Sequence, residues 1–272
     1  MNSANKQVKT IKYNKKYFES LFKSHDYSKK VKFASFGHIY RDLANLCKLS
    51  PGDKVVDFGC GNGELSFCLY QKYGAEVTGI DYSGDAIQIA KDNLVKLCKI
   101  DKNPNIRFIN VNNDGLPKLK NISYVYFCDV LEHMYDHEIS QVLKRVKLWN
   151  NKKIRIVVHT DNNTFLRFVR PFIDGLSIIT GTSSVHQVQS RNLWESERHV
   201  NLTNPSKFRK NISKYGFNEV KLFYPEVNMD KIERQLGGLS RLPLLKKIVF
   251  FALKMLKPLS PSFYGVYEYE SR

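Results

Sequence analysis

From Leu49 onward, short apolar runs alternate with longer segments in which apolar residues recur at helical spacing. The short runs have the length of buried strands, while apolar positions three and four residues apart predict helices. Strands that alternate with helices predict a parallel, doubly wound sheet. We therefore expect an α/β fold with a Rossmann-like seven-stranded doubly wound sheet and helices on both faces. The expected strands are 54–58, 76–80, 106–111, 123–128, 154–159, 219–223 and 262–270, and the expected helices 64–73, 84–98, 137–148 and 205–215.

Changes in this pattern divide the chain into four segments. Residues 1–48 interleave lysines with aromatic residues and predict an N-terminal basic helical lid. Residues 49–160 form the expected core of the fold, which contains the glycine-rich turn discussed below. Residues 161–204 are rich in Thr, Ser, Gln and Asn, and we interpret them as a substrate-cap insertion after strand five. Residues 205–272 hold the distal half of the sheet and an amphipathic helix over 242–259.

The segment 242–259 separates charge from apolar surface. On a helical projection, Lys246, Lys247, Lys254 and Lys257 gather on one side and bulky apolar residues on the other. A basic side, an apolar side and a length too short to span a bilayer predict a helix that lies in a membrane interface. The alternative is a helix packed against the domain core with its lysines in water, which is the commoner arrangement. Both interpretations stay open.

The composition limits the class of protein. The chain has 272 residues, of which 42% are hydrophobic, so it is long and apolar enough for a sizeable core. No apolar run reaches about 18 residues, and the start lacks an apolar signal segment. Five scattered cysteines without a CxxC pair argue against a disulfide framework or a zinc knuckle. We expect a cytoplasmic protein, with peripheral attachment to the inner face of the membrane as a hypothesis.

The charge leaves the partner open. A formal net charge of +17 fits attraction to nucleic acid, to anionic lipid or to phosphorylated substrates. It fits equally well a Lys- and Asn-rich background composition without functional meaning.

The most specific signal is a glycine-rich turn after the first expected strand. The sequence DFGCGNG runs from Asp57 to Gly63, and the second expected strand ends at Asp81. Glycines let the backbone turn sharply and approach a ligand closely. An acidic side chain at the end of strand two can accept hydrogen bonds from both ribose hydroxyls. Together they predict a site for an adenosine moiety.

The spacing of this turn selects among adenosine ligands. Its glycines follow G-x-G-x-G, whereas the dinucleotide fingerprint is G-x-G-x-x-G. A carboxylate at Asp57 would repel a pyrophosphate and suits the ammonium of an amino-acid tail. S-adenosylmethionine has such a tail, a cationic sulfonium and no phosphate. It is the cofactor that we expect.

At this point the chain resembles the class I S-adenosylmethionine-dependent methyltransferases over roughly 49–159. DFGCGNG (57–63) is similar to the first motif of the family, GIDYS (79–83) to the second, and NVNNDGLP (110–117) to the third. Asn112 stands where the family usually has an Asp that caps the adenine amino group. The resemblance implies a cofactor held by Asp57, Gly59, Cys60, Gly61, Gly63, Asp81, Tyr82, Asn112, Asn113 and Asp129.

Three further segments resemble one subgroup of that family, which acts on small molecules and includes ubiquinone-biosynthesis and sugar O-methyltransferases. CDVLEH (128–133) is similar to its motif after strand four. HVNLT (199–203) and KYGF (214–217) are similar to its distal half. In such members the residues after strand four face the methyl group.

Methyl transfer from a sulfonium is an in-line displacement, so the protein supplies alignment, water exclusion and, for a hydroxyl nucleophile, a base. His133 is the expected catalytic base, and Glu132 either orients it or caps the next helix. In one alternative, His133 only caps that helix and shapes the pocket. In another, allowed by the ubiquinone resemblance, Asp129, Glu132 and His133 bind a divalent metal; our prediction is a site without a metal. The expected substrate contacts are His159, His186, Arg198 and His199.

These residues support three hypotheses of function. The first is S-adenosylmethionine-dependent O-methylation of a small-molecule, sugar or lipid-linked acceptor, at a membrane surface in the last case. The second is an RNA or protein methyltransferase, which the charge favours, although the chain has neither an NPPY-type tetrapeptide nor a basic-aromatic RNA-binding pattern. The third is a non-catalytic, membrane-associated binding protein.

Overall fold

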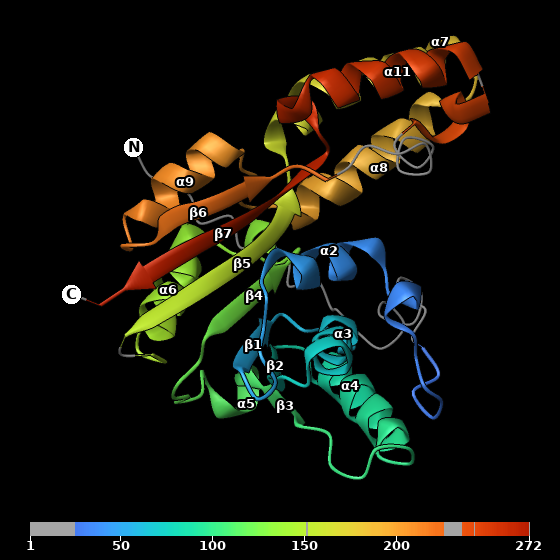
Figure 1. The fold of residues 1–272 in the computed structure, drawn as a ribbon. Helices are drawn as coiled ribbons and strands as arrows, with labels where there is room; N and C mark the ends of the chain where they lie inside the picture. Colours follow the sequence, from blue (N-terminus) through green and yellow to red (C-terminus); the bar gives the residue numbers. More distant parts are fainter. Residues whose placement is uncertain (1–24, 151, 226–235, 242, 272) are drawn as a thin grey trace. The chain divides into compact units, whose positions relative to one another are not determined.

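The computed structural model describes residues 25–150, 152–225, 236–241 and 243–271, and contains a seven-stranded sheet with helices on both faces (Figure 1). The strand order is β3-β2-β1-β4-β5-β7-β6. The expected α/β doubly wound fold is confirmed. The strands are β1 Lys54–Phe58, β2 Glu76–Asp81, β3 Ile106–Asn110, β4 Tyr124–Cys128, β5 Lys153–Asp161, β6 Asn218–Phe223 and β7 Ser262–Glu270. Each agrees with its expected bounds within two residues.

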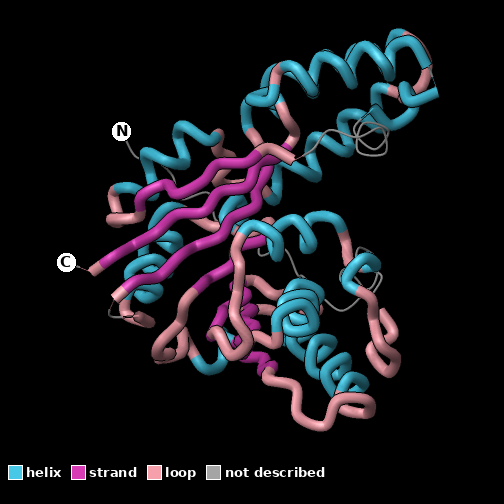
Figure 2. Tube along the Cα trace, viewed as in Figure 1, coloured by secondary structure: helices cyan, strands magenta, loops and turns pink. Residues whose placement is uncertain are grey.

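The sheet is mixed rather than wholly parallel, which corrects the prediction of a parallel sheet. β1 pairs in parallel with β2 and β4, and β2 in parallel with β3, but β6 and β7 are antiparallel. β7 begins beside the end of β6, where Phe223 pairs with Tyr264, and runs back along it. Figure 2 shows these strands side by side in magenta.

Helices alternate with strands from β1 to β5, and three helices then follow one another between β5 and β6. Within the described residues, the helices longer than one turn are α2 His38–Leu46, α3 Glu64–Tyr73, α4 Gly84–Leu97, α6 Asp136–Lys147, α7 Arg170–Ile179, α8 Val185–Arg198, α9 Pro205–Ser213 and α11 Pro243–Met255. A single-turn helix, α5 Val111–Asp114, follows β3, and a 3-10 turn, Leu131–His133, follows β4.

The chain divides into two compact units, each described here by itself. The first comprises 1–130, 141–157 and 269–272, and the second 131–140 and 158–268. In the first unit, β1, β2 and β4 are buried almost throughout. Parallel strands covered by helices on both faces lose both faces to the core, so their sequences read as continuous apolar runs. The predicted division into four segments stays a prediction, and residues 1–24 of the predicted lid lie outside the described residues.

In the second unit, the predicted insertion 161–204 contains two helices, α7 and α8. The polar residues of this segment include a start signal for α8: Ser184 accepts from the backbone N–H of Gln187, whose side chain accepts in turn from the backbone N–H of Ser184. This reciprocal capping box satisfies two of the donors that a helix start leaves unpaired. A polar composition therefore marks a helix boundary here.

The second unit also has a small apolar core of its own. Phe165, Ile173, Leu236, Leu239 and Leu253 are buried in it, with other apolar residues of α7 and α11 packed around them. The expected helix 242–259 is α11, and one of its faces packs as the alternative interpretation proposed. Among the described residues, no helix is both long and apolar enough to cross a bilayer.

The turn at Gly63 provides a test of the fold. Gly63 has φ +89°, and a Cβ there would lie 2.8 Å from the Phe108 ring, whereas Gly52 has φ +82° with open space around it. We expect Gly52→Ala to lower the free energy of unfolding by about 1–2 kcal/mol through the left-handed backbone alone. Gly63→Ala should cost about 1–3 kcal/mol more because of crowding. Equal losses in chemical denaturation would contradict this packing.

Candidate functional site

The turn between β1 and α3 is fixed to the end of β2 by its own backbone. The N–H of Gly59 donates to the Ile80 carbonyl at 2.7 Å, and the N–H of Gly61 donates to Asp81 Oδ2 at 2.9 Å. Gly59 has φ +74°, and a Cβ there would lie 2.4 Å from a methyl group of Val130. The turn therefore needs glycine both for its conformation and for its close approach to the chain after β4.

Asp81 joins this turn to the loop that follows β2. Its Oδ1 accepts from the backbone N–H of Ser83 at 2.8 Å, while Oδ2 takes the Gly61 bond. Burial raises the pKa of Asp81, and its backbone hydrogen bonds oppose that rise. The carboxylate is thus held in one orientation at the end of the strand, where the sequence predicted an acceptor for ribose hydroxyls.

Asp57 is a buried carboxyl in the middle of this site. It lies on β1, is 1% exposed and accepts a hydrogen bond from Ser66 Oγ at 2.7 Å. Burial raises the pKa of Asp57 to about 7, and the charge of Asp81 contributes to the shift. The group therefore changes its charge near neutral pH, and a cation placed beside it would favour the ionised form.

The loops after β2 and β3 are tied together by amide side chains. Asn112 Nδ2 donates to the Tyr82 carbonyl at 2.7 Å, and the backbone N–H of Asn112 donates to Asn110 Oδ1 at 3.0 Å. Tyr82 is exposed and Cys60 is buried. The side chain of Asn113 lies outside the described part of the structure. Asn110 was not among the predicted site residues, although the third motif begins with it.

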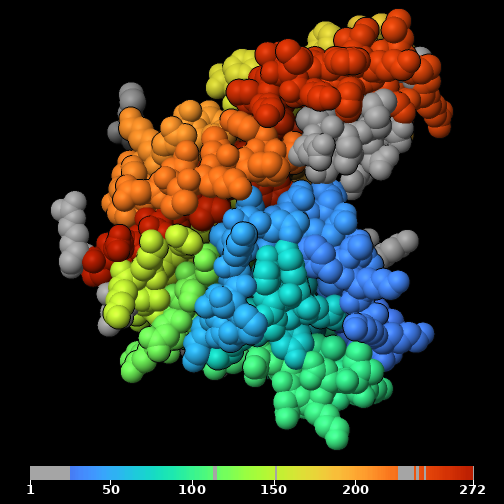
Figure 3. Space-filling model, viewed as in Figure 1, coloured from blue at the N-terminus to red at the C-terminus, as the bar shows by residue number. Residues whose placement is uncertain are grey.

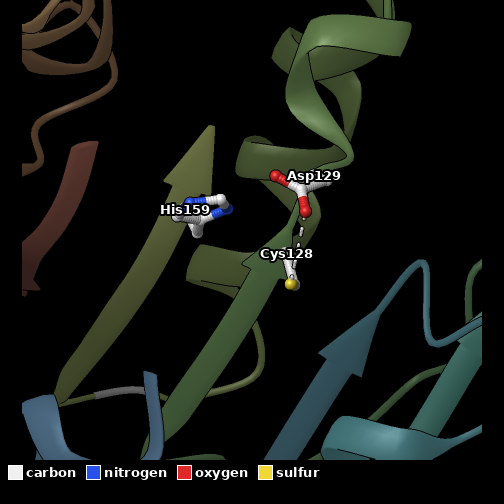
Figure 4. A group of neighbouring side chains, drawn as sticks. All are labelled: Cys128, Asp129 and His159. Atoms are coloured by element: carbon white, nitrogen blue, oxygen red, sulfur yellow. Dashed lines mark hydrogen bonds between the residues drawn. The ribbon is translucent and has the colours of Figure 1, made fainter. Parts of the chain in front are cut away.

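Asp129 turns the chain at the end of β4. Its φ is +54°, a left-handed conformation that is uncommon outside glycine and that Asp tolerates better than most residues. Cys128 Sγ donates to Asp129 Oδ2 at 3.9 Å, and Figure 4 shows these two residues at the end of β4 and His159 on β5. Such backbone strain is common at functional sites.

Residues before α3 also reach the cofactor turn, and the sequence did not single them out. His25 Nδ1 lies 2.9 Å from Glu64 Oε2, next to Gly63, and the Tyr27 ring packs 4.1 Å from Phe67. Tyr40 on α2 is half-buried, and its pKa is raised well above its usual value by desolvation and by nearby acidic groups, including Cys128 and Asp129. No local pattern predicts contacts between residues so far apart in sequence.

In the second unit, the ring of His133 is oriented by a backbone carbonyl. His133 Nδ1 lies 3.0 Å from the oxygen of Arg198, the last residue of α8. Since a carbonyl oxygen only accepts, Nδ1 must carry the proton. In a neutral imidazole, Nε2 is then the nitrogen with the lone pair, as a general base requires.

The two distant motifs of the second unit meet at this histidine. The backbone oxygen of Glu132 accepts from the N–H groups of Val200 and Asn201 at 2.9 and 3.0 Å. The ring of His199 lies 5.0 Å from that of His133. The buried Glu132 carboxylate accepts from Thr160 Oγ1 at 2.9 Å. Its expected action on His133 stays a prediction.

The remaining predicted substrate contacts lie in different surroundings. His159 is buried on β5, with Nε2 3.0 Å from Ser262 Oγ and its ring 4.5 Å from that of Tyr264. His186 is exposed near the start of α8, and the Arg198 guanidinium lies 3.5 Å over the Trp194 ring. The roles of these residues, and the alternative metal site of Asp129, Glu132 and His133, stay predictions.

Comparison with known proteins finds similarity over part of the chain. Residues 55–151 match the family model of a methyltransferase domain. The chain is 34% identical over 110 residues to a probable cobalt-precorrin-6B C(15)-methyltransferase of Methanobrevibacter smithii, covering 40% of this chain and 54% of the relative. The chain spans about half, or less, of the length of the curated relatives it matches.

Two solved structures share the fold. One is phosphoethanolamine N-methyltransferase 2 of Haemonchus contortus in complex with S-adenosylmethionine, with a TM-score of 0.57, 11% identity and coverage of 97% of this chain and 58% of that one. The other is the cyclopropane synthase MmaA2 of Mycobacterium tuberculosis, with a TM-score of 0.56, 10% identity and coverage of 98% and 99%. The first of these two structures contains S-adenosylmethionine, the cofactor expected for this chain. The O-methyltransferase subgroup is not established by these matches.

The buried carboxyl of Asp57 predicts a pH dependence of stability. Its folded pKa of about 7 exceeds the unfolded value near 3.8, so protonation stabilises the fold at low pH and this contribution is lost as pH rises through 7. Asp57→Asn keeps an acceptor for Ser66 but cannot ionise, so its stability does not fall as the pH rises. We expect the free energy of unfolding of the variant, minus that of the wild type, to increase by about 2–3 kcal/mol from about pH 5 to pH 8.

Chemical denaturation across this pH range measures the difference. The exposed Asp92→Asn variant is the matched control and should give a nearly constant difference from the wild type. Parallel pH profiles for Asp57→Asn and the wild type would show that Asp57 titrates normally.

Proposed function

We propose that this chain, whose residues 55–151 form a class I methyltransferase domain, transfers the methyl group of S-adenosylmethionine to a hydroxyl of a small-molecule, sugar or lipid-linked acceptor. The observation that carries the choice of a hydroxyl is the orientation of His133 by the Arg198 carbonyl. A hydroxyl must lose its proton as it is methylated, and His133 Nε2 is the lone-pair nitrogen of the neutral ring.

The first unit supplies the cofactor site in this proposal. Asp81 accepts from the ribose hydroxyls, because each carboxylate oxygen carries two lone pairs and can accept from a ligand as well as from the backbone. Asp57 pairs with the ammonium of the amino-acid tail. Since Asp57 has a pKa of about 7, the cofactor displaces a proton from it when it binds below that pH.

The reaction itself is a displacement at the methyl carbon. When bound, S-adenosylmethionine would supply this carbon: the acceptor oxygen would bond to it as its bond to sulfur broke, with S-adenosylhomocysteine as the leaving group. The acceptor proton passes to His133 Nε2 and then to water. Charge and atoms balance, with one proton released for each methyl group transferred.

The role of Asp81 can be tested by calorimetry. Asp81→Ala removes the proposed ribose contacts and the acceptor of the Gly61 N–H, and hydrogen bonds to a charged group contribute about 1.5–3 kcal/mol each. We expect S-adenosylmethionine affinity to fall by about 100-fold or more. Asp92→Ala on the exposed side of α4 is the control and should bind as the wild type does. If the wild type does not bind S-adenosylmethionine, the proposed function is wrong, and the hypothesis of a non-catalytic binding protein remains.

The role of His133 can be tested by separating binding from turnover. His133→Ala should leave cofactor affinity unchanged and reduce turnover by about 100-fold, because only the base is lost. The exposed His137, four residues away on α6, is the matched control, and His137→Ala should retain activity. A tritiated-methyl assay against lipid, glycan and RNA fractions provides the acceptor. Full activity of His133→Ala, or labelling of RNA alone, would refute the proposed reaction.

A further inference from the structure

Helix α11 has a second apolar face, which is exposed in the part of the chain that the structure describes. Leu245, Val249 and Phe250 contact the small core of the second unit, and Leu253 is buried in it. A separate row on the same helix comprises Leu244, Ile248, Phe251 and Met255, whose side chains are 57–79% exposed. Their spacing of four, three and four residues places them in one stripe along the helix. Figure 3 shows the atoms of α11, in orange-red, at the surface.

Helix α7 and the turn before it repeat this arrangement. Ile173 of α7 is buried in the core that α11 also contacts, and Leu176 packs against that core. Phe168, Phe172 and Ile179 are 64–84% exposed and share one side of the helix, again at intervals of four and seven residues. Two helices that share one core therefore each present a stripe of large apolar residues to solvent. Soluble proteins rarely leave such contiguous apolar surface exposed without a function.

The exposed charged residues of α7 and α11 are basic. Helix α11 carries Lys246, Lys247 and Lys254 and no acidic residue. On the helical projection, Lys247 and Lys254 lie between the packed face and the exposed stripe. The one acidic residue of α7, Asp174, is buried and forms an ion pair with Arg191.

We propose that the exposed stripes of α7 and α11, with the adjoining lysines, form a docking surface for a bilayer that contains anionic lipid. The inference rests on the proposed function, because a docked bilayer would bring a lipid-linked acceptor to the methyltransferase. Apolar side chains enter the acyl boundary, and the lysines extend their charged ends to the headgroups. Each lysine near an anionic surface adds about a fivefold preference.

The charge pattern disfavours protein occupants. A second copy of this chain would bring its own lysines against these lysines, and like charges across an interface repel. Protein interfaces in general are also depleted in lysine. An anionic bilayer satisfies the apolar stripe and the lysines together.

Vesicle flotation of the full chain tests the proposal. We expect binding to vesicles of phosphatidylcholine with phosphatidylglycerol, weaker binding to phosphatidylcholine alone, and weakening by salt. The double variant Ile248→Asp/Phe251→Asp should reduce partitioning by about 100-fold, because two large apolar side chains no longer enter the bilayer. Lys247→Gln/Lys254→Gln should reduce it by about 10-fold or more on anionic vesicles only.

The control substitutes two apolar residues of similar exposure in the first unit. Val95→Asp/Leu148→Asp should leave vesicle binding unchanged. Calorimetry with S-adenosylmethionine should give wild-type affinity for every variant, which verifies that each one is folded. Equal vesicle binding by Ile248→Asp/Phe251→Asp and the control would overturn the proposal. The proposal would also be wrong if the wild type self-associated without binding vesicles and Ile248→Asp/Phe251→Asp abolished that self-association.

The two proposals fail separately. A wild type that binds S-adenosylmethionine and transfers methyl groups but does not bind anionic vesicles overturns the docking surface alone. A wild type that binds vesicles but not S-adenosylmethionine overturns the proposed function and leaves the docking surface standing.

Discussion

The hydrogen bond from the Gly61 N–H to Asp81 is the contact on which the cofactor site depends. It closes the turn after β1 onto the end of β2, and it forms only because glycine at 59, 61 and 63 gives this turn its positive φ angles. Two neighbouring parallel strands end at one edge of the sheet, and this bond holds the turn after β1 against that edge, where the proposed cofactor site lies. The position of the Asp81 carboxylate therefore depends on the backbone conformation of the glycine turn.

Much of this half of the molecule follows from local sequence. The strand bounds agree because β1, β2 and β4 are buried on both faces and their apolar runs stop where burial stops. The glycine turn and Asp81 were likewise predictable, since they are set by steric limits within a few residues. The antiparallel β7 was not predictable, because the direction of a strand depends on where a long connection returns.

The second unit shows what local patterns leave out. His133 is oriented by the carbonyl of Arg198, which is 65 residues away in sequence. Both histidines of the 5.0 Å pair were named from motifs, yet their contact could not be inferred because it depends on how α8 ends. The contact between His25 and Glu64 escaped prediction for the same reason. Side chains positioned by tertiary contacts carry no periodicity of their own.

The raised pKa of Asp57 has a consequence for cells whose internal acidity varies. Near pH 7 such a carboxyl is half protonated and half ionised, and only the ionised form attracts a cation. In the proposed function, protons would therefore compete with the amino-acid tail of the cofactor for Asp57. Affinity for the cofactor would then fall as the pH drops below about 7, whatever the acceptor.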